Sequence, residues 1–367
     1  MAFDLVLRNA RLANSDGATV DIAVAEGRIA AIAPHIAADG ESVNARGQFV
    51  SPALVECHFH LDKSRILDRV APLADRRATD YMARTAAVKH TFTVEDVYAR
   101  ARATLEQCLL NGVGHMRTHI EVDPNVGLRG FDAIERLAKD YAWGMDLQLC
   151  VFLQEGWTNV PGAEAIVREA LKRGAHAVGG APRYDTDGPA QIRRIFALGK
   201  EFDVDVDIHL DGGYTTHDMD IHQVCDLADE MGWGGRVAIG HGNKYSCLPT
   251  KELEALGRRL AKSGVAVAVL PTTDLFTSGR HLEHSVIRGI ADANALIAQG
   301  ANCAISTNNV LNPFTPYGHP DLLRQALIAA VTAHLGNLDQ LAWLLDLITV
   351  NPLGLAITCF REDRAFQ

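Results

Sequence analysis

The stretch Glu56-Cys57-His58-Phe59-His60-Leu61-Asp62-Lys63 decides how the rest of this 367-residue chain is interpreted. It continues an apolar run, residues 49–55, that is typical of a buried β-strand. Side chains alternate between the two faces of a strand, so His58 and His60 point the same way. Two imidazoles on one face favour a divalent metal site, although one packed histidine beside one solvated histidine would give the same pattern.

Similar apolar runs recur along the chain, and amphipathic segments with helical periodicity alternate with them. The runs are residues 49–60, 115–122, 147–154, 175–182, 204–210, 236–241, 265–271 and 302–306. The segments predicted as helices are residues 94–110, 130–141, 163–173, 190–202, 219–231, 251–262 and 284–298. Eight strands separated by helices are typical of a closed barrel. We therefore predict an α/β fold, a (β/α)8 TIM barrel.

The first 50 residues have a different pattern, with short strands separated by turns such as Asp16-Gly17 and Asp39-Gly40. We expect a small antiparallel β domain there, equivalent to half of a β-sandwich. The predicted domain organisation is this β domain over residues 1–50, a catalytic barrel over residues 51–350 and a short atypical tail over residues 351–367.

The composition excludes several classes of function. A net charge of −10 without a cluster of basic and aromatic residues argues against nucleic acid as a partner. No window approaches about 18 uninterrupted apolar residues, so no membrane partner is expected. The seven cysteines lack CxxC spacing, which favours reduced thiols in a cytoplasmic protein over a disulfide framework.

Polar residues gather where the predicted strands end, which is where barrel enzymes carry their chemistry. They are His58 and His60, Arg117-Thr118-His119, Gln154-Glu155, His209 and Asp211, His241, Thr272-Thr273-Asp274 and Thr307-Asn308-Asn309. Any one strand end meets solvent and tolerates a polar residue, but this many together predict a functional mouth. The four histidines at positions 58, 60, 209 and 241 predict a metal-ligand cluster on one rim.

The chain resembles the amidohydrolase superfamily, in the branch of the cytosine deaminases and N-isopropylammelide amidohydrolases. The matching stretches are residues 56–63, Arg117-Thr118-His119, Gln154-Glu155-Gly156, Asp207-Ile208-His209, Gly240-His241 and residues 270–275. The resemblance implies one Zn or Fe ion and hydrolysis at a C–N bond of a small nitrogen heterocycle. It also implies that His58, His60 and His209 are metal ligands, that Gln154 contacts the substrate ring, and that His241 orients or protonates groups around the metal-bound water.

Two positions depart from the pattern of that branch. The deaminases have His-x-x-Glu after the fifth strand, whereas this chain has glycine at position 212. The superfamily places a metal-ligating aspartate at the end of the eighth strand, where this chain has Asn308. An amide oxygen is neutral and cannot act as a base near pH 7. Asp211 and His241 are the candidate replacements, so we assign catalytic roles to His241, Asp211 and Asn308.

Three accounts fit these departures. The first is a hydrolase that keeps its metal on the three histidines, and the second is a metal-independent hydrolase that uses the histidine cluster as acid, base and oxyanion stabiliser. The third is a catalytically impaired ligand-binding homologue.

In each of these accounts we expect the pocket to bind a small polar nitrogen heterocycle. The residues predicted to contact it are Gln154, Asn309, Trp157, His119 and Lys63. The tail does not match the strand that completes the family's small domain. That domain is therefore expected either to rest on its N-terminal strands alone or to be covered by a neighbouring subunit, and on the second basis we predict a homo-oligomer.

Overall fold

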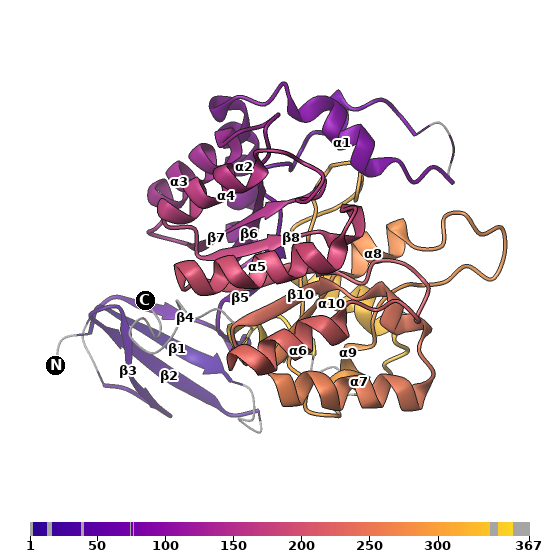
Figure 1. Cartoon of the computed structure of the whole chain (residues 1–367). Coiled ribbons are helices and arrows are strands. Elements are labelled where there is room, and N and C mark those ends of the chain that lie inside the picture. Colours follow the sequence, from indigo (N-terminus) through magenta and orange to yellow (C-terminus); the bar gives the residue numbers. More distant parts are fainter. Residues whose placement is uncertain are drawn as a thin grey trace. The chain divides into compact units, whose positions relative to one another are not determined.

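The computed structural model describes residues 3–12, 17–37, 40–73, 75, 77–337 and 344–354. These residues form two compact units, one that ends at Ala53 and one that begins at Leu54. The larger unit carries the candidate site, and most of its elements are labelled in Figure 1.

The larger unit is built on an eight-stranded parallel sheet in the order β12-β11-β10-β9-β8-β7-β6-β5, so that every strand neighbours the next one in sequence. The strands are β5 (Leu54–Phe59), β6 (Val113–Glu121), β7 (Asp146–Leu153), β8 (Ala177–Gly180), β9 (Asp205–Leu210), β10 (Val237–His241), β11 (Val265–Val269) and β12 (Cys303–Ile305). Their side chains are mostly buried, and all five of strand β11 are. Strands that are apolar on both faces suit a parallel sheet covered by helices.

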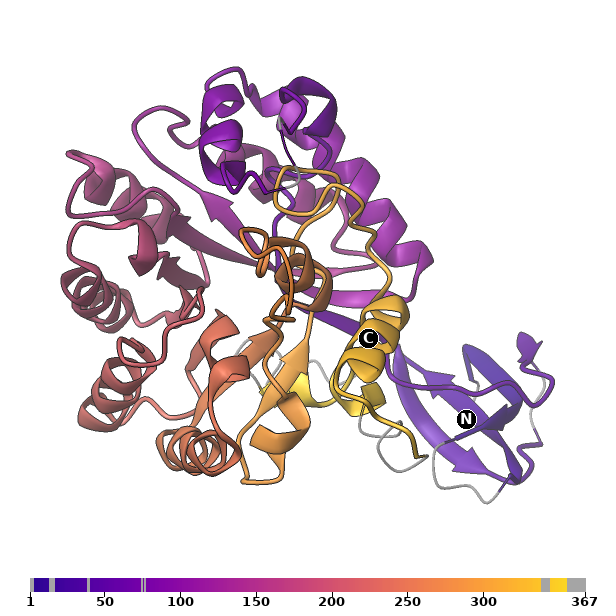
Figure 2. The same cartoon turned by 90° about the vertical axis from the view of Figure 1, so that its right-hand side faces the viewer.

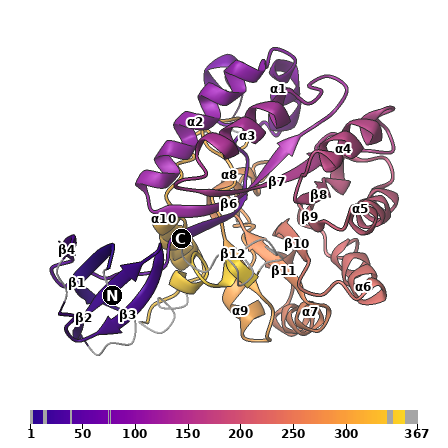
Figure 3. The same cartoon turned by 90° about the vertical axis from the view of Figure 1, so that its left-hand side faces the viewer.

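Helices surround this sheet, and Figure 3 shows α2, α3, α5, α6 and α7 outside the ring of strands. The view from the other side in Figure 2 shows the same ring. The helices are α1 (Tyr81–Lys89), α2 (Val94–Leu110), α3 (Arg129–Asp140), α4 (Ala163–Lys172), α5 (Gly188–Phe202), α6 (Ile221–Met231), α7 (Thr250–Ser263), α8 (Pro271–Thr277), α9 (Ala293–Ile297) and α10 (Leu322–Thr332). Helices α6 and α7 end at left-handed glycines, Gly232 and Gly264, where a side chain would be strained.

The barrel closes between its first and last strands at the end that carries the site. His60 N–H donates to Asn308 O at 2.9 Å, and Asn308 N–H donates to His58 O at 3.2 Å. Below this seam the buried Glu56 carboxyl accepts hydrogen bonds from the Thr307 N–H and the Ser306 hydroxyl. Burial raises the pKa of Glu56 to about 7, although these hydrogen bonds act in the opposite direction. The (β/α)8 barrel predicted from the sequence is confirmed.

The small N-terminal β domain is also confirmed, as a four-stranded sheet in the order β3-β2-β1-β4. Its strands are β1 (Leu5–Arg11), β2 (Thr19–Ala25), β3 (Arg28–Ala33) and β4 (Ser42–Asn44). The sheet is mixed, not purely antiparallel as predicted, because β4 pairs with β1 in parallel. Strands β1 and β3 both pair antiparallel with β2, so they run in the same direction. After β3 the chain crosses to the other side of β1, where β4 runs parallel to β1.

The helix predicted over residues 284–298 is wrong for most of its length, because only Ala293–Ile297 is helical. Gly289 adopts a left-handed φ of +66°, and the Asp292 side chain caps the new helix by accepting from Asn294 N and Ala295 N. Residues 351–354 of the predicted tail form a 3-10 turn, η4 (Asn351–Gly354).

Parts of the sequence prediction lie outside the described residues. They are the turn residues Asp16 and Asp39, residues 338–343 of the predicted barrel, and residues 355–367 of the predicted tail. Across the ranges that the structure describes, no helix combines the length and apolarity that a bilayer crossing needs.

Candidate active site

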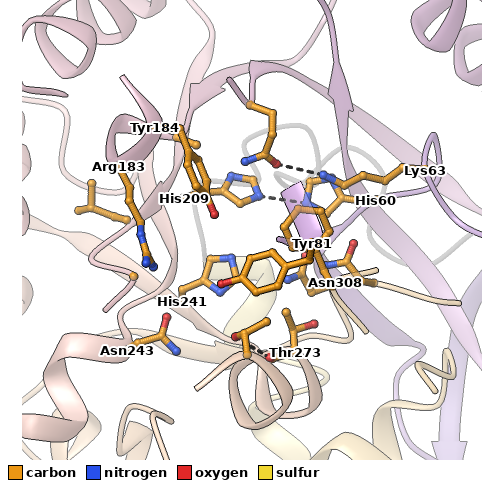
Figure 4. A pocket seen from close by; sticks show the side chains of 17 residues that line it. His60, Lys63, Tyr81, Arg183, Tyr184, His209, His241, Asn243, Thr273 and Asn308 are labelled. Atoms are coloured by element: carbon orange, nitrogen blue, oxygen red, sulfur yellow. Dashed lines mark hydrogen bonds between the residues drawn. The ribbon is translucent and has the colours of Figure 1, made fainter. Parts of the chain in front are cut away.

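Three histidine nitrogens meet at one point of the barrel mouth. His58 and His60 come from β5, and His209 comes from β9. The Nε2 atom of His209 lies 3.1 Å from His58 Nε2 and 3.0 Å from His60 Nε2. Two nitrogens that bind one zinc ion at tetrahedral angles lie roughly 3.3 Å apart. The donor set and its spacing therefore fit a divalent metal. Figure 4 shows the side chains of His60 and His209 pointing toward each other.

The surroundings keep these imidazoles in the form that binds metal. His60 Nδ1 lies 3.2 Å from His119 O, which suits a proton on Nδ1 and a free lone pair on Nε2. His58 Nδ1 lies 3.6 Å from the Asp207 carboxylate. Burial lowers the pKa of His58 to about 3 and holds the pKa values of His60 and His209 well below their usual value. Neutral imidazoles are the ligands that Zn and Fe require.

His119 lies beneath this cluster, not at the cavity surface as predicted for a substrate contact. It is fully buried, its ring centroid is 3.9 Å from that of His58, and its Nε2 lies 3.2 Å from Asp207 Oδ1. Burial alone would raise the pKa of Asp207, but His119 and His58 hold it well below its usual value. Arg117 Nη1 also contacts this carboxylate, at 3.2 Å. His119 therefore supports the histidine cluster from below.

His241 forms a second functional pair at the cavity wall. It ends strand β10, and its Nδ1 lies 2.7 Å from Asp274 Oδ1 on helix α8. Asp274 is fully buried, and its other oxygen accepts from Leu270 N–H at 3.3 Å. An ionised carboxylate can only accept, so Nδ1 carries the proton and Nε2 is left as an acceptor. A base held this way by a buried carboxylate is a common catalytic arrangement.

Asn308 lines the same cavity at the seam of the barrel. Its φ is +67°, a left-handed conformation that Asn and Asp tolerate better than other residues with side chains. Its side chain is buried, and in the described part of the chain its Oδ1 atom has no hydrogen-bond partner. A buried oxygen without a partner is costly, which fits a position that a bound ion, water or substrate would satisfy. Asn309 beside it also lines the cavity and accepts from Asn312 Nδ2 at 2.7 Å.

Lys63 orients the side chain of Gln154. The Lys63 ammonium donates to Glu121 Oε1 at 2.6 Å and to Gln154 Oε1 at 3.1 Å. An ammonium has no acceptor, so it fixes the amide with its oxygen toward Lys63. The Gln154 NH2 group is then available to donate to a ligand in the cavity. Lys63 and Gln154 both line the cavity, as the sequence predicts for substrate contacts.

These groups line one cavity that opens to solvent at the barrel mouth. The lining residues that were not predicted from the sequence include Tyr81, Arg183, Tyr184, Asn243 and Phe314. Arg183 and Tyr184 lie in the turn η2 (Pro182–Tyr184), immediately after strand β8. Extending the strand-end rule past Pro182 would have found them, whereas nothing in the spacing indicated Tyr81, which begins helix α1.

Asp211 and Trp157 are placed differently from their predicted roles. Asp211 follows strand β9, but its carboxylate turns away from the cavity and accepts from the N–H groups of Asp220 and Ile221 at the start of helix α6, at 2.8 and 3.2 Å. Trp157 is 7% exposed and packs in the main hydrophobic core. Neither residue lines the cavity that the described residues form. Asp211 therefore serves as a helix cap and Trp157 as a core residue.

Asp185 fastens the turn that carries Arg183. Its carboxylate accepts from the N–H groups of Thr158 and Asp187, at 3.0 and 3.1 Å, and from Gln191 Nε2 at 2.7 Å. Partial burial would raise its pKa, but hydrogen bonds from the hydroxyl and N–H of Thr158 and from the N–H groups of Trp157 and Asp187 outweigh it and lower the pKa to about 2. A carboxyl whose pKa is lower in the folded chain than in the unfolded chain stabilises the fold at pH values above its ordinary pKa, near 4. This contribution to stability is lost as the pH falls toward 2.

We expect Asp185→Asn to lower the free energy of unfolding by about 1 kcal/mol near neutral pH, after allowance for solvent screening. The deficit should shrink as the pH is lowered below about 4, because the wild-type carboxyl then becomes protonated too. Urea unfolding across this pH range measures the effect, and the exposed Asp68→Asn is the matched control. If the difference in unfolding free energy between Asp185→Asn and the wild type stays constant down to the lowest pH, the lowered pKa assigned to Asp185 is wrong.

Comparisons with known proteins agree with this geometry. Residues 49–352 match the Amidohydrolase family. The chain is 25% identical to the N-isopropylammelide isopropyl amidohydrolase of Pseudomonas sp. (strain ADP), over 95% of this chain and 84% of that protein. It is 23% identical to the pterin deaminase of Rhizobium rhizogenes (strain K84 / ATCC BAA-868), over 91% and 77% of the two chains.

A solved structure leads to the same family. The 5-methylcytosine deaminase of Klebsiella pneumoniae, liganded with 5-fluorocytosine, superimposes with a TM-score of 0.90 at 26% identity, covering 98% of this chain and 87% of the other. The family match spans the whole barrel, including every histidine of the cluster. This chain therefore belongs to the amidohydrolase family.

Proposed function

We propose that this protein hydrolyses a C–N bond of a small polar nitrogen heterocycle, with one Zn or Fe ion on His58, His60 and His209. The observation that carries the proposal is the position of His209 Nε2, which lies 3.1 Å from His58 Nε2 and 3.0 Å from His60 Nε2. His60 and His209 line the same cavity as His241. The similar proteins named above are an isopropylammelide hydrolase and two deaminases of ring compounds, which supports the same class of substrate.

When bound, the ion would supply Lewis acidity and lower the pKa of a water molecule. Residues of this chain bind and orient the substrate and transfer the proton. Gln154, held by Lys63, donates its NH2 group to an acceptor on the ring. The Asn308 amide offers an uncharged oxygen at the place where the family has an aspartate, so it can accept a hydrogen bond but not remove a proton.

His241 is the proposed base. Its Nε2 atom takes a proton from the attacking water as the water oxygen bonds to the ring carbon. The same proton then passes to the departing nitrogen as the C–N bond breaks, so the histidine returns to its starting form. Asp274 holds the imidazole in this orientation and stabilises its positive charge between the two steps. The reaction consumes one water and needs no carboxylate at positions 212 or 308.

Metal analysis of the purified protein tests the proposal. We expect about one equivalent of Zn or Fe by inductively coupled plasma mass spectrometry. Asn308→Asp should tighten the metal roughly tenfold or more in a chelator competition, because it adds an anionic oxygen beside the three histidines. Asn309→Asp, the same change one residue away, is the matched control.

The outcomes separate the alternatives. Turnover by protein stripped of metal would favour a hydrolase that uses only the histidine cluster. Tight ligand binding without turnover, with or without metal, would favour a catalytically impaired binding protein. A homo-oligomeric state and a cytoplasmic location stay predictions of the sequence.

A further inference from the structure

Arg183 fills the space beside Gly212 where a side chain would otherwise lie. A Cβ atom added to Gly212 would lie 3.0 Å from Arg183 Nη1 and 3.6 Å from Arg183 Cδ, with Asn243 Oδ1 next at 3.8 Å. Figure 4 shows the Arg183 side chain reaching from its turn toward His241 and Asn243. At the position where the sequence pattern leads one to expect an acid, the cavity therefore contains a guanidinium.

The cavity has an unbalanced positive charge around this arginine. Among the described residues that line it, none is aspartate or glutamate. The other lining cation, Lys63, is neutralised by Glu121 at 2.6 Å. Arg183 has no carboxylate partner within the described part of the chain, since the nearby Asp211 faces helix α6. A guanidinium is always ionised and presents a planar fork of donors that matches a carboxylate.

We propose that this site selects ring substrates that carry a carboxylate and that Arg183 binds this carboxylate, an inference that rests on the hydrolase function proposed above. The bound carboxylate lies against the Gly212 backbone, on the side of the cavity that faces Asn243. The ring then lies between Arg183 and Gln154, with its scissile bond near His241. Arg183 is a specificity residue here, since it contacts the substrate away from the reacting atoms.

Two phenols line the same cavity as Arg183. Burial raises the pKa of Tyr184 to about 12 and raises that of Tyr81 above its usual value, so both hydroxyls stay protonated at neutral pH. Both side chains line the cavity (Figure 4). Protonated hydroxyls and a guanidinium together favour a negatively charged group over a neutral one.

Isothermal titration calorimetry on the full chain tests the inference with two matched pairs of ligands. The pairs are orotate against uracil and 5-oxoproline against 2-pyrrolidinone, which differ by a carboxylate on a planar and on a saturated ring. The carboxylate of at least one pair should bind roughly 10- to 100-fold more tightly than its neutral partner, as expected for hydrogen bonds to a charged group. Arg183→Gln should abolish this preference, and Arg193→Gln, an exposed arginine on helix α5, should keep it.

A second variant tests the same role of Arg183 by changing its neighbour Gly212. Gly212 does not have a left-handed φ, and the nearest atom to an added Cβ is the flexible end of Arg183, so Gly212→Glu should be accommodated. Its carboxylate should pair with the guanidinium and remove the preference for anions. No preference for the carboxylate in either pair, including no binding at all, would overturn the inference, as would a preference that survives in Arg183→Gln.

The same titration on His209→Ala separates this inference from the proposed function. That variant lacks one of the three proposed metal ligands, whereas Arg183 is unchanged. A preference for carboxylates that persists without metal supports the role of Arg183 even where the metal assignment fails. If the preference for carboxylates disappears together with the metal, the carboxylate binds the metal ion and not Arg183. That result would overturn the proposed role of Arg183.

Discussion

His209→Ala is expected to release the metal and lower kcat/KM by about a thousandfold or more. The reason is that its Nε2 atom lies between the other two ligands, 3.1 Å from His58 and 3.0 Å from His60, so its loss leaves two ligands that no longer enclose a site. A bound ion contributes several kcal/mol to the stabilisation of charge in the transition state, and each 1.36 kcal/mol corresponds to about tenfold in rate. Metal content and steady-state kinetics measure the two losses together.

His222→Ala is the matched control for this substitution. His222 is exposed on helix α6, outside the cavity lining, so its loss should change neither metal content nor turnover. If His209→Ala kept one equivalent of metal, the ligand set would have to be different. The second group of metal-capable atoms, on His58, His119 and Asp207, would then be the candidate.

His241→Gln is expected to lower kcat by about 10²- to 10⁴-fold with the metal retained, which is the usual contribution of a general base. Glutamine keeps a polar side chain of similar reach but cannot take a proton near neutral pH. His217→Gln, an exposed position outside the cavity lining, is the control. Steady-state kinetics on protein of verified metal content should show the loss in kcat and little change in KM.

Asp274→Asn should reproduce part of this loss, because the contact of Asp274 with the reacting groups runs through the Nδ1 atom of His241, at 2.7 Å. In the double variant the two effects should be strongly non-additive, since an aspartate without its histidine has nothing left to orient. A purely structural role for Asp274 would instead give additive losses. Full activity in His241→Gln would falsify the assignment of the base.

Local sequence patterns were sufficient for the architecture and for assigning four histidines to one end of the barrel. Apolar runs alternating with amphipathic segments determine the strands and helices, and parallel strands bring their carboxyl ends to one edge. His58, His60, His209 and His241 could therefore be assigned to one mouth before any distance was known. The segment 284–298 was mispredicted because its apolar spacing resembles a helix, while the left-handed backbone at Gly289 begins a different path.

Depth and side-chain direction could not be predicted in the same way. Alternation along a strand tells on which face of the sheet a side chain lies, but not how far it lies from the mouth of the barrel. His119 was therefore expected to line the cavity, whereas it is buried beneath it. Asp211 ends its strand as expected, but its carboxylate turns to cap helix α6. Trp157 follows a strand end and packs into the core. For Asp211, the N–H groups at the start of helix α6 explain the direction of the side chain.

The sequence by itself determined the barrel, the strand ends and the identity of the histidines, because these depend on periodicities that neighbouring residues carry. Only the tertiary structure decided that Asp274 holds His241 and that Lys63 orients Gln154, because these pairs come from separate strand ends. The same holds for Arg183 beside Gly212. Such contacts depend on the stagger of the strands and the paths of the connecting turns, which set distances between residues that no local pattern relates.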